Sequence, residues 1–260
     1  MTIGILAAMH DEVADLIGDM TRQSGNHVRR IGMRDYHVGE LEGQPCVVVL
    51  ARIGKVAAAA TAVTLIREFG VTEIVFTGLA GGVGQHVKVG DIVIADRLVQ
   101  HDMDARPLFP HHEVPLLGQS EFVTAVALGA ELKAAAEVFL REDLQHMVLP
   151  DVRTTFGIGQ PLLHVGMIAS GDQFVADIGQ VNSILSALPD ALAVEMEGAA
   201  VAQICFEYDV PCAVLRTISD RADASAHIDF GKFLSDVASH YSTGILRRFI
   251  AARRSNHATN

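Results

Sequence analysis

The chain has 260 residues, half of them hydrophobic, and a formal net charge of −11. Its length suits one large α/β domain over residues 1–260, and its apolar runs fall short of the roughly 18 residues that a membrane-spanning helix needs. The negative charge disfavours binding to a phosphate backbone, because nucleic-acid binders usually carry a basic patch.

The three cysteines, Cys46, Cys205 and Cys212, form no C-x-x-C pair. A sparse, odd number of cysteines favours a reducing compartment over a disulfide framework or a zinc site. The first apolar run follows no Lys or Arg, and acidic residues come directly after it, which is untypical of a secretory signal. We therefore expect a cytoplasmic protein that needs no metal or other cofactor.

In chain order, short apolar runs alternate with helical stretches. Continuous apolar runs are typical of strands covered on both faces, and strands are predicted at residues 3–9, 46–51, 73–78, 91–96, 162–170, 191–197 and 212–219. Helices are predicted at residues 11–20, 55–69, 122–143, 177–187, 198–207 and 231–250. This alternation predicts a three-layer α/β/α sandwich around a central mixed β-sheet.

Three segments depart from the alternation. Residues 36–50 read as two strands joined by a short glycine-containing turn, which predicts an antiparallel hairpin added to the sheet. Residues 100–121 contain three prolines and no clear period, and such long irregular insertions are usually functional loops or partner contacts. From about residue 252 we expect a flexible tail, with Arg247, Arg248, Arg253 and Arg254 as a solvated helix end.

Ligands in open α/β sheets tend to lie outside the carboxyl ends of strands, so polar residues at those ends are candidates for a site. Four clusters qualify: Asp11 with Glu12, the glycine-rich residues 78–82, Glu195 with Glu197, and Arg216 with Ser219 and Asp220.

Each cluster also has a structural interpretation. Asp11 and Glu12 could simply favour a helix start, and the glycines could form a tight turn. Arg216 could be the salt-bridge partner of a glutamate, which the spacing supports as well as it supports catalysis. The glycine-rich segment is neither a Walker loop nor G-x-G-x-x-G, which disfavours a nucleotide-phosphate site.

The spacing of Glu195 and Glu197 is more informative. Residues i and i+2 of a strand point to one side, so both carboxylates would face one pocket or flank a strand-to-helix bend at Met196. Two converging carboxylates suit a polyol or a water molecule better than a phosphate.

At this point the chain resembles the bacterial 5′-methylthioadenosine/S-adenosylhomocysteine nucleosidases of the nucleoside phosphorylase superfamily. Seven motifs occur in the order of that family and span residues 3 to about 235. They are IGILAAMHDEV (3–13), IGKVAAA (53–59), TGLAGG (77–82), VGDIVIAD (89–96), SGDQF (170–174), AVEMEGAAVA (193–202) and RTISDRAD (216–223).

The resemblance implies hydrolysis of an N-glycosidic bond with release of adenine. It implies Glu12 as the general base that activates water, and Asp220 as the acid at adenine N7 with Ser219 beside it. Other implied contacts are Met196 and Glu197 to the ribose, Glu195 and Arg216 near the water, Phe174 and the Val175 backbone to adenine, Met9, Ile53 and Phe230 to the 5′-thio group, and Gly81 near the sugar.

The chemistry of the reaction suits these roles. Breaking the bond builds oxocarbenium character on the ribose and negative charge on the purine, so the site needs an acid at N7 and anionic groups near the sugar. Asp220 must hold a proton near neutral pH, and burial near other carboxylates would raise its pKa accordingly. Glu12 must stay ionised, so the two carboxyls should lie in contrasting environments.

Two departures from the family pattern stand out. Leu79 occupies the position where the family's T-G-S-A-G-G loop often has a serine, which removes one polar contact near the water. Residues 100–160 are longer than in compact members, in the region where a neighbouring subunit usually covers the 5′ pocket. The resemblance and the 100–121 segment imply a homodimer. A metal site at His101, Asp102, Asp104, His111 and His112 matches no standard spacing.

Three alternatives stay open. A phosphorylase of the same superfamily would need cationic groups for phosphate, for which Arg52 is a candidate, although Glu12 would repel that anion. A nucleosidase for another 5′-modified nucleoside, such as an aminofutalosine, would use the same acid and base. A non-catalytic nucleoside-binding protein would need neither Glu12 nor Asp220.

Overall fold

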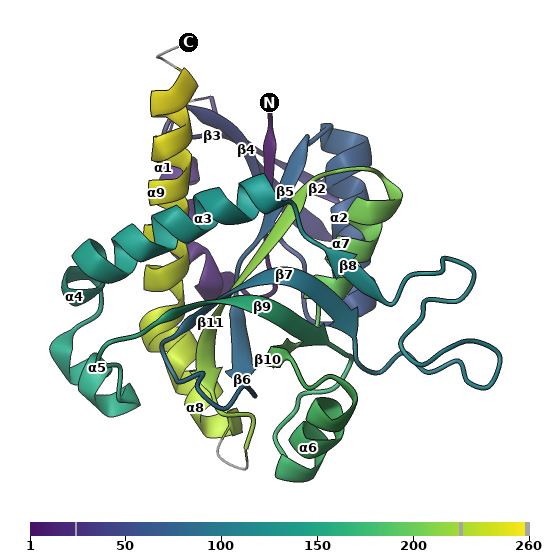
Figure 1. The fold of residues 1–260 in the computed structure, drawn as a ribbon. Helices are drawn as coiled ribbons and strands as arrows, with labels where there is room; N and C mark the ends of the chain where they lie inside the picture. The colour runs from purple at the N-terminus through teal and green to yellow at the C-terminus, as the bar shows by residue number, and fades with distance from the viewer. Residues whose placement is uncertain (24, 224–225, 258–260) are drawn as a thin grey trace.

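The computed structural model describes residues 1–23, 25–223 and 226–257 (Figure 1). Within them the strands pair into one sheet with the order β2-β3-β4-β1-β5-β11-β6-β10-β9-β7-β8. The strands are β1 (Ile3–Ala7), β2 (His27–Ile31), β3 (Arg34–Leu41), β4 (Gln44–Leu50), β5 (Glu73–Phe76), β6 (Leu79–Gly82), β7 (Ile92–Gln100), β8 (Glu121–Val123), β9 (Leu163–Ser170), β10 (Ala191–Glu195) and β11 (Cys212–Asp220).

The helices cover both faces of this sheet. They are η1 (His10–Glu12), α1 (Ala14–Arg22), α2 (Lys55–Phe69), α3 (Val126–Val138), η2 (Phe139–Asp143), α4 (Leu144–Met147), α5 (Pro150–Phe156), α6 (Ile178–Ala187), α7 (Gly198–Glu207), α8 (Ala226–Phe233), η3 (Leu234–Ala238) and α9 (Ser239–His257). No helix in the described ranges is both long enough and apolar enough to cross a membrane.

Two hydrophobic cores lie on opposite faces of the sheet. Ile3 and Ile5 of β1 pack in the core that contains α1, α3 and α9. Leu6 of the same strand packs in the core that contains α2 and α7. Figure 1 shows these two helix groups on either side of the strands. The fold is therefore the predicted α/β/α sandwich around a mixed sheet.

The long strand β11 joins the two halves of the sheet and delivers the last predicted cluster to the site. Residues 212–214 pair in parallel with β5, residues 215–217 pair in antiparallel with β7, and the end of the strand pairs in parallel with β6. All nine residues of β11 are buried. Its carboxyl end therefore reaches the glycines of β6, and Gly81 of β6 also pairs with Val194 of β10.

The predicted hairpin over residues 36–50 is present as β3 and β4, with β2 added at its outer edge. Most residues of β2 are exposed, so it lacks the apolar pattern that marked the other strands. The glycine-rich segment forms β6 instead of only a turn. At Gly82 a Cβ would lie 3.0 Å from Ile218 and 3.2 Å from Val87, so the missing side chain permits the close strand packing.

The 122–143 prediction was partly wrong, because the segment begins as β8 and α3 starts only at Val126. Residues 100–121 are also irregular in the structure, as their sequence predicted. Between β7 and β8 the chain forms a single isolated bridge, Val114 to Gln119, within a succession of turns.

Beyond residue 252 the chain is still helical, and α9 continues to His257. The physical reason is Arg253, which is 8% exposed and pairs with both Glu73 and Glu131. Glu73 begins β5, so this pair ties the end of α9 to the sheet. Arg247 and Arg248 pair with Asp19 and Asp143, so three of the four arginines of the basic cluster form ion pairs within the chain.

We expect Arg253→Ala to lower the free energy of unfolding by about 3 kcal/mol, because it leaves the buried Glu73 carboxylate without its cation. Urea unfolding followed by circular dichroism measures this change. Arg22→Ala is the matched control, since its pair with Asp19 is solvent-exposed and should contribute less than about 1 kcal/mol. Equal effects of the two substitutions would contradict an anchoring role for Arg253.

Candidate active site

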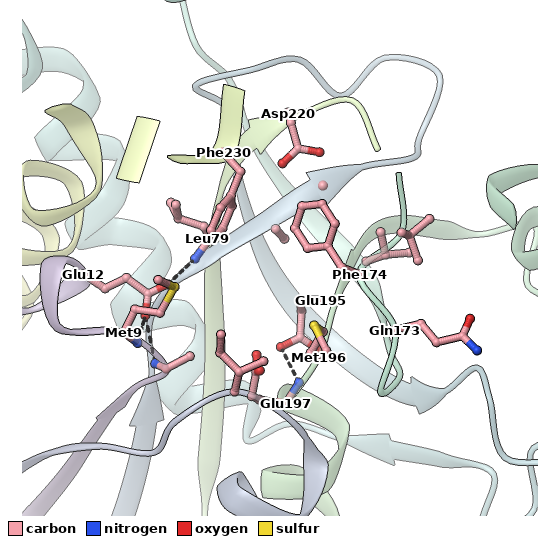
Figure 2. Close-up of a pocket in the computed structure, with 16 residues that line it drawn as sticks. Met9, Glu12, Leu79, Gln173, Phe174, Glu195, Met196, Glu197, Asp220 and Phe230 are labelled. Atoms are coloured by element: carbon pink, nitrogen blue, oxygen red, sulfur yellow. Dashed lines mark hydrogen bonds between the residues drawn. The ribbon is translucent and has the colours of Figure 1, made fainter. Parts of the chain in front are cut away.

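A pocket opens at the carboxyl ends of β1, β10 and β11 (Figure 2). Its walls come from segments far apart in the sequence, as the sheet topology requires. The lining residues are Ala8, Met9, Glu12, Ile53, Leu79, Ala80, Gly81, Gln173, Phe174, Val175, Val194, Glu195, Met196, Glu197, Asp220 and Phe230.

Glu12 is held at the pocket wall by backbone N–H groups. Its Oε2 accepts hydrogen bonds from Ala8 N (2.8 Å) and Met9 N (2.9 Å), and its Oε1 accepts one from Leu79 N (3.0 Å). Three N–H donors suit an ionised carboxylate. Burial nevertheless dominates and raises the pKa of Glu12 above its usual 4.5, against these donors and the positive charge of Arg216.

The contact from Leu79 clarifies the departure in the glycine loop. Leu79 reaches Glu12 through its backbone N–H, which any residue at that position would supply. Its side chain lines the pocket as an apolar group, so the wall beside Glu12 is drier than a serine would make it. The preceding Gly78 lets Glu12 approach, because a Cβ there would lie 2.8 Å from Glu12 Oε1.

Glu195 and Arg216 form the buried centre of the site. Arg216 Nη2 donates to Glu195 Oε2 at 2.6 Å, and the side chains are 1% and 2% exposed. Glu195 also accepts from the Ser170 hydroxyl and from the backbone N–H groups of Glu197 (3.2 Å) and Gly198 (2.8 Å). Both oxygens of Glu195 are therefore engaged by these donors, and its pair with Arg216 is the salt bridge that the sequence had offered as a structural interpretation.

Glu197 lies beside this centre, and its Oε1 accepts a hydrogen bond from Gly54 N at 2.8 Å. Burial and the negative charge of Glu195 raise the pKa of Glu197 to about 8, although Arg216 and the Gly54 N–H act in the opposite direction. A pKa near 8 favours the protonated form of Glu197 at neutral pH. A protonated carboxyl can both donate to and accept from a pair of hydroxyl groups.

Asp220 closes another side of the pocket, separated from Glu12 in the view of Figure 2. It is 3% exposed, its Oδ2 accepts from the Ser219 hydroxyl at 2.7 Å, and its Oδ1 accepts from Ala222 N at 2.8 Å. The absence of a side chain at Gly81 leaves room for it, since a Cβ there would lie 3.0 Å from Asp220 Oδ1.

Aromatic and apolar side chains make up much of the remaining wall. The ring of Phe174 meets that of Phe230 edge-on, with centroids 5.6 Å apart, and Phe174 is 45% exposed at the pocket mouth. Met9 and Ile53 also line the pocket. This combination can hold a flat ring at the mouth and an apolar substituent beside it.

Most residues named from the sequence meet in this pocket. Arg216 and Ser219 do not line it, and each instead bonds a residue that does. Sequence reasoning missed Ala8, Ala80, Gln173 and Val194 among the lining residues, and also Ser170, which holds Glu195. Ser170 and Gln173 belong to the SGDQF motif, so their proximity to Phe174 was the available signal.

Among the residues that the structure describes, no Lys or Arg lines the pocket. Arg52, the candidate phosphate ligand, points instead to the carbonyl oxygen of Met33, to which its Nη2 donates at 2.6 Å. Within the described ranges, no group of three or more His, Cys, Asp or Glu side chains is placed to hold a metal ion.

Comparison with known proteins places this geometry in context. A model of the phosphorylase superfamily matches residues 2–251. A 5′-methylthioadenosine/S-adenosylhomocysteine nucleosidase of Mycobacterium tuberculosis is 36% identical over 255 residues, which cover 95% of this chain and 96% of that protein. An aminodeoxyfutalosine nucleosidase of Helicobacter pylori is 34% identical over 248 residues, with coverage of 95% and 97%.

A solved structure gives the same result in three dimensions. The 5′-methylthioadenosine/S-adenosylhomocysteine nucleosidase of Streptococcus pneumoniae, in complex with the transition-state inhibitor MT-ImmA, matches with a TM-score of 0.81 and 31% identity. The match covers 97% of this chain and 100% of that one. These similarities confirm the resemblance that the seven motifs indicated.

We expect Glu197→Gln to stabilise the protein at alkaline pH. The native pKa near 8 exceeds the usual 4.5, so wild type loses stability as pH rises from about 4.5 to 8, and the amide avoids this loss. Thermal unfolding should show a melting temperature higher by about 10 °C at pH 9, with little difference at pH 4.5. If the variant were less stable than wild type at pH 9, the raised pKa of the buried Glu197 carboxyl would be contradicted.

Proposed function

The chain belongs to the phosphorylase superfamily, and within it we propose that the protein is a nucleosidase. It hydrolyses the N-glycosidic bond of 5′-methylthioadenosine and/or S-adenosylhomocysteine and releases adenine and the 5-thioribose product. The 36% identical relative bears this activity in its name, and the matched structure binds a transition-state inhibitor of such an enzyme.

The observation that carries the proposal is the chemistry of the pocket wall. Glu12, Glu197 and Asp220 converge on it from three different segments, and the described lining residues include no Lys or Arg. A purine nucleoside offers hydroxyl groups, a basic N7 and a flat ring, which carboxyls and aromatic rings can bind. A phosphate co-substrate would meet Glu12 without a cation to offset the repulsion.

In the proposed mechanism, water attacks the anomeric carbon C1′ while Glu12 takes one of its protons. The bond from C1′ to N9 breaks, its electron pair goes to the purine, and Asp220 transfers its proton to N7, so that neutral adenine leaves. The sugar keeps the water oxygen. Glu12 is suited to the base role because it accepts only from N–H donors and lies in an apolar surrounding that strengthens its basicity.

The sugar is assigned to Glu197 and Met196. Glu197 would bind the ribose hydroxyls, because its remaining hydrogen-bonding capacity faces the pocket once Oε1 has accepted the Gly54 N–H. Met196 would pack against the sugar. Phe174 would stack on adenine with the Val175 backbone at the edge of the base, while Met9, Ile53 and Phe230 would surround the 5′ substituent. Glu195 and Arg216 fix the wall and do not react.

Two further candidates differ in substrate or reaction. The aminodeoxyfutalosine nucleosidase relative favours a second 5′-modified nucleoside as substrate, since the same acid and base would serve it. A phosphorylase is disfavoured by the lining residues and by the outward direction of Arg52. A non-catalytic binder is disfavoured because it would have no use for both Glu12 and Asp220.

We also propose a cytoplasmic homodimer. The support for the dimer is apolar surface near the pocket mouth, where Ile53 and Val56 are 55% and 82% exposed at the start of α2. Leu108 and Leu116 in the 100–121 segment are 83% and 93% exposed. Free, buried cysteines at positions 46, 205 and 212 suit a reducing compartment.

Purified protein should release adenine from methylthioadenosine or adenosylhomocysteine at a rate that added phosphate does not change, because the proposed nucleophile is water and the described lining residues include no Lys or Arg to bind phosphate. Chromatography of the free base after incubation with these nucleosides, adenosine, inosine and an aminofutalosine measures both the reaction and its preference. Adenine release only with phosphate would establish a phosphorylase, and no release from any nucleoside would favour the binder.

Asp220→Asn should lower kcat by about a thousandfold or more while nucleoside binding stays close to that of wild type, because the amide keeps the shape of the carboxyl but has no acidic proton to give N7. Steady-state rates and isothermal titration calorimetry separate the two quantities. Turnover near the wild-type rate would remove Asp220 from the acid role.

A further inference from the structure

Lys55, the first residue of α2, lies next to the pocket without lining it. Its Nζ donates to Gln100 Oε1 at 3.0 Å and to Asp102 Oδ1 at 2.6 Å. The Lys55 and Asp102 side chains are only 15% and 23% exposed. A cation at a helix N-terminus opposes the helix dipole, so helix stability does not account for a lysine at this position.

Asp102 and Asp172 complete a ring of contacts with Lys55. Asp102 Oδ2 accepts from Asp172 N at 2.9 Å, and Asp172 Oδ1 accepts from Lys55 N at 2.8 Å. The ring, which we call the Lys55 clasp, therefore comprises Lys55, Asp102 and Asp172. It fastens together three separate segments: the start of α2, the chain just after β7, and the loop that follows β9.

Two of these segments carry pocket residues. On one side of the clasp, Gly54 directly precedes Lys55 and donates its N–H to Glu197 Oε1 at 2.8 Å. On the other side, Gln173, Phe174 and Val175 directly follow Asp172 and line the pocket mouth. Figure 2 shows Phe174 on a different side of the pocket from Glu197.

The fit between these segments is tight at the backbone. Gly54 has a φ of +98°, which disfavours any residue with a Cβ. A Cβ there would also lie 3.2 Å from Asp172 Oδ1. The start of α2 and the Asp172 loop therefore touch directly, and a displacement of one would move the other.

We propose that Lys55 is a positioning residue for nucleoside binding, which acts through the Lys55 clasp to hold the Gly54 N–H on Glu197 and the Phe174 loop at a fixed separation. This inference rests on the proposed nucleosidase function. Within the described ranges, the hydrogen bonds of the clasp run among its own members and to Gln100, so we expect it to govern the binding of sugar and base and to leave proton transfer alone.

Lys55→Met keeps the length of the side chain and removes the ammonium group. We expect KM for the cleaved nucleoside to rise about tenfold, the scale of one hydrogen bond to a charged group, while kcat changes less than about threefold. Lys55→Arg restores the cation and should return KM to within about threefold of wild type. Asp102→Asn should raise KM similarly, and the double substitution Lys55→Met with Asp102→Asn should add little to either change.

Lys133→Met is the matched control, because Lys133 forms an exposed pair with Glu137 on α3 and should leave KM unchanged. Melting temperatures of all variants show whether each is folded, and Asp102→Asn and Lys55→Arg provide the test should Lys55→Met not fold. Wild-type KM in both Lys55→Met and Asp102→Asn, or a loss confined to kcat, would overturn the clasp. A wild-type protein that cleaves no nucleoside would instead refute the proposed function.

Discussion

The pocket depends on how the chain buries Arg216. A guanidinium that is 1% exposed must have a negative partner in contact, because an unpaired charge in the interior is costly. Glu195 supplies that partner, and its oxygens receive Ser170 and the N–H groups at the start of α7 in addition. Arg216 also lies over the Phe76 ring at 4.1 Å, which fixes its plane. The Arg216–Glu195 pair thus holds the backbone of Glu197 in place, because the Glu197 N–H donates to Glu195.

Because Arg216 is already neutralised by Glu195, it offers Glu12 and Glu197 only partial compensation. Burial consequently raises the pKa of both carboxyls. Carboxyl groups can lie this close to the neighbouring backbone only where that backbone carries no side chain. Gly78 makes that room for Glu12, Gly81 for Asp220 and Gly198 for Glu195, each by lacking a Cβ that would lie within about 3.2 Å of a carboxylate oxygen. The glycines of this site therefore serve carboxyl groups, not phosphates.

The sequence predicted those parts of the molecule that local chemistry determines. The bounds of α2 follow from its alanine content and from Gly70, which ends the helix in the left-handed conformation. The pocket residues could be named because they follow apolar strands and match family motifs. The role of Glu195 could not be read from spacing, since its partners Arg216 and Ser170 lie 21 and 25 residues away. The helical C-terminus was missed for the same reason, because Arg253 finds Glu73 only across 180 residues.

The same dependence on long-range contacts explains how the walls of a site with little positive charge can still be held in place. Glu197 and the Phe174 loop follow the ends of β10 and β9, and neither strand fixes the position of the segment that lies against them. The start of α2 is that segment. The Gly54 N–H donates to Glu197, and the Lys55 N–H donates to Asp172, which directly precedes the loop. The positive charge near the pocket is therefore placed behind its wall, in Arg216 and Lys55, where it orders the acidic groups without attracting an anion to the site.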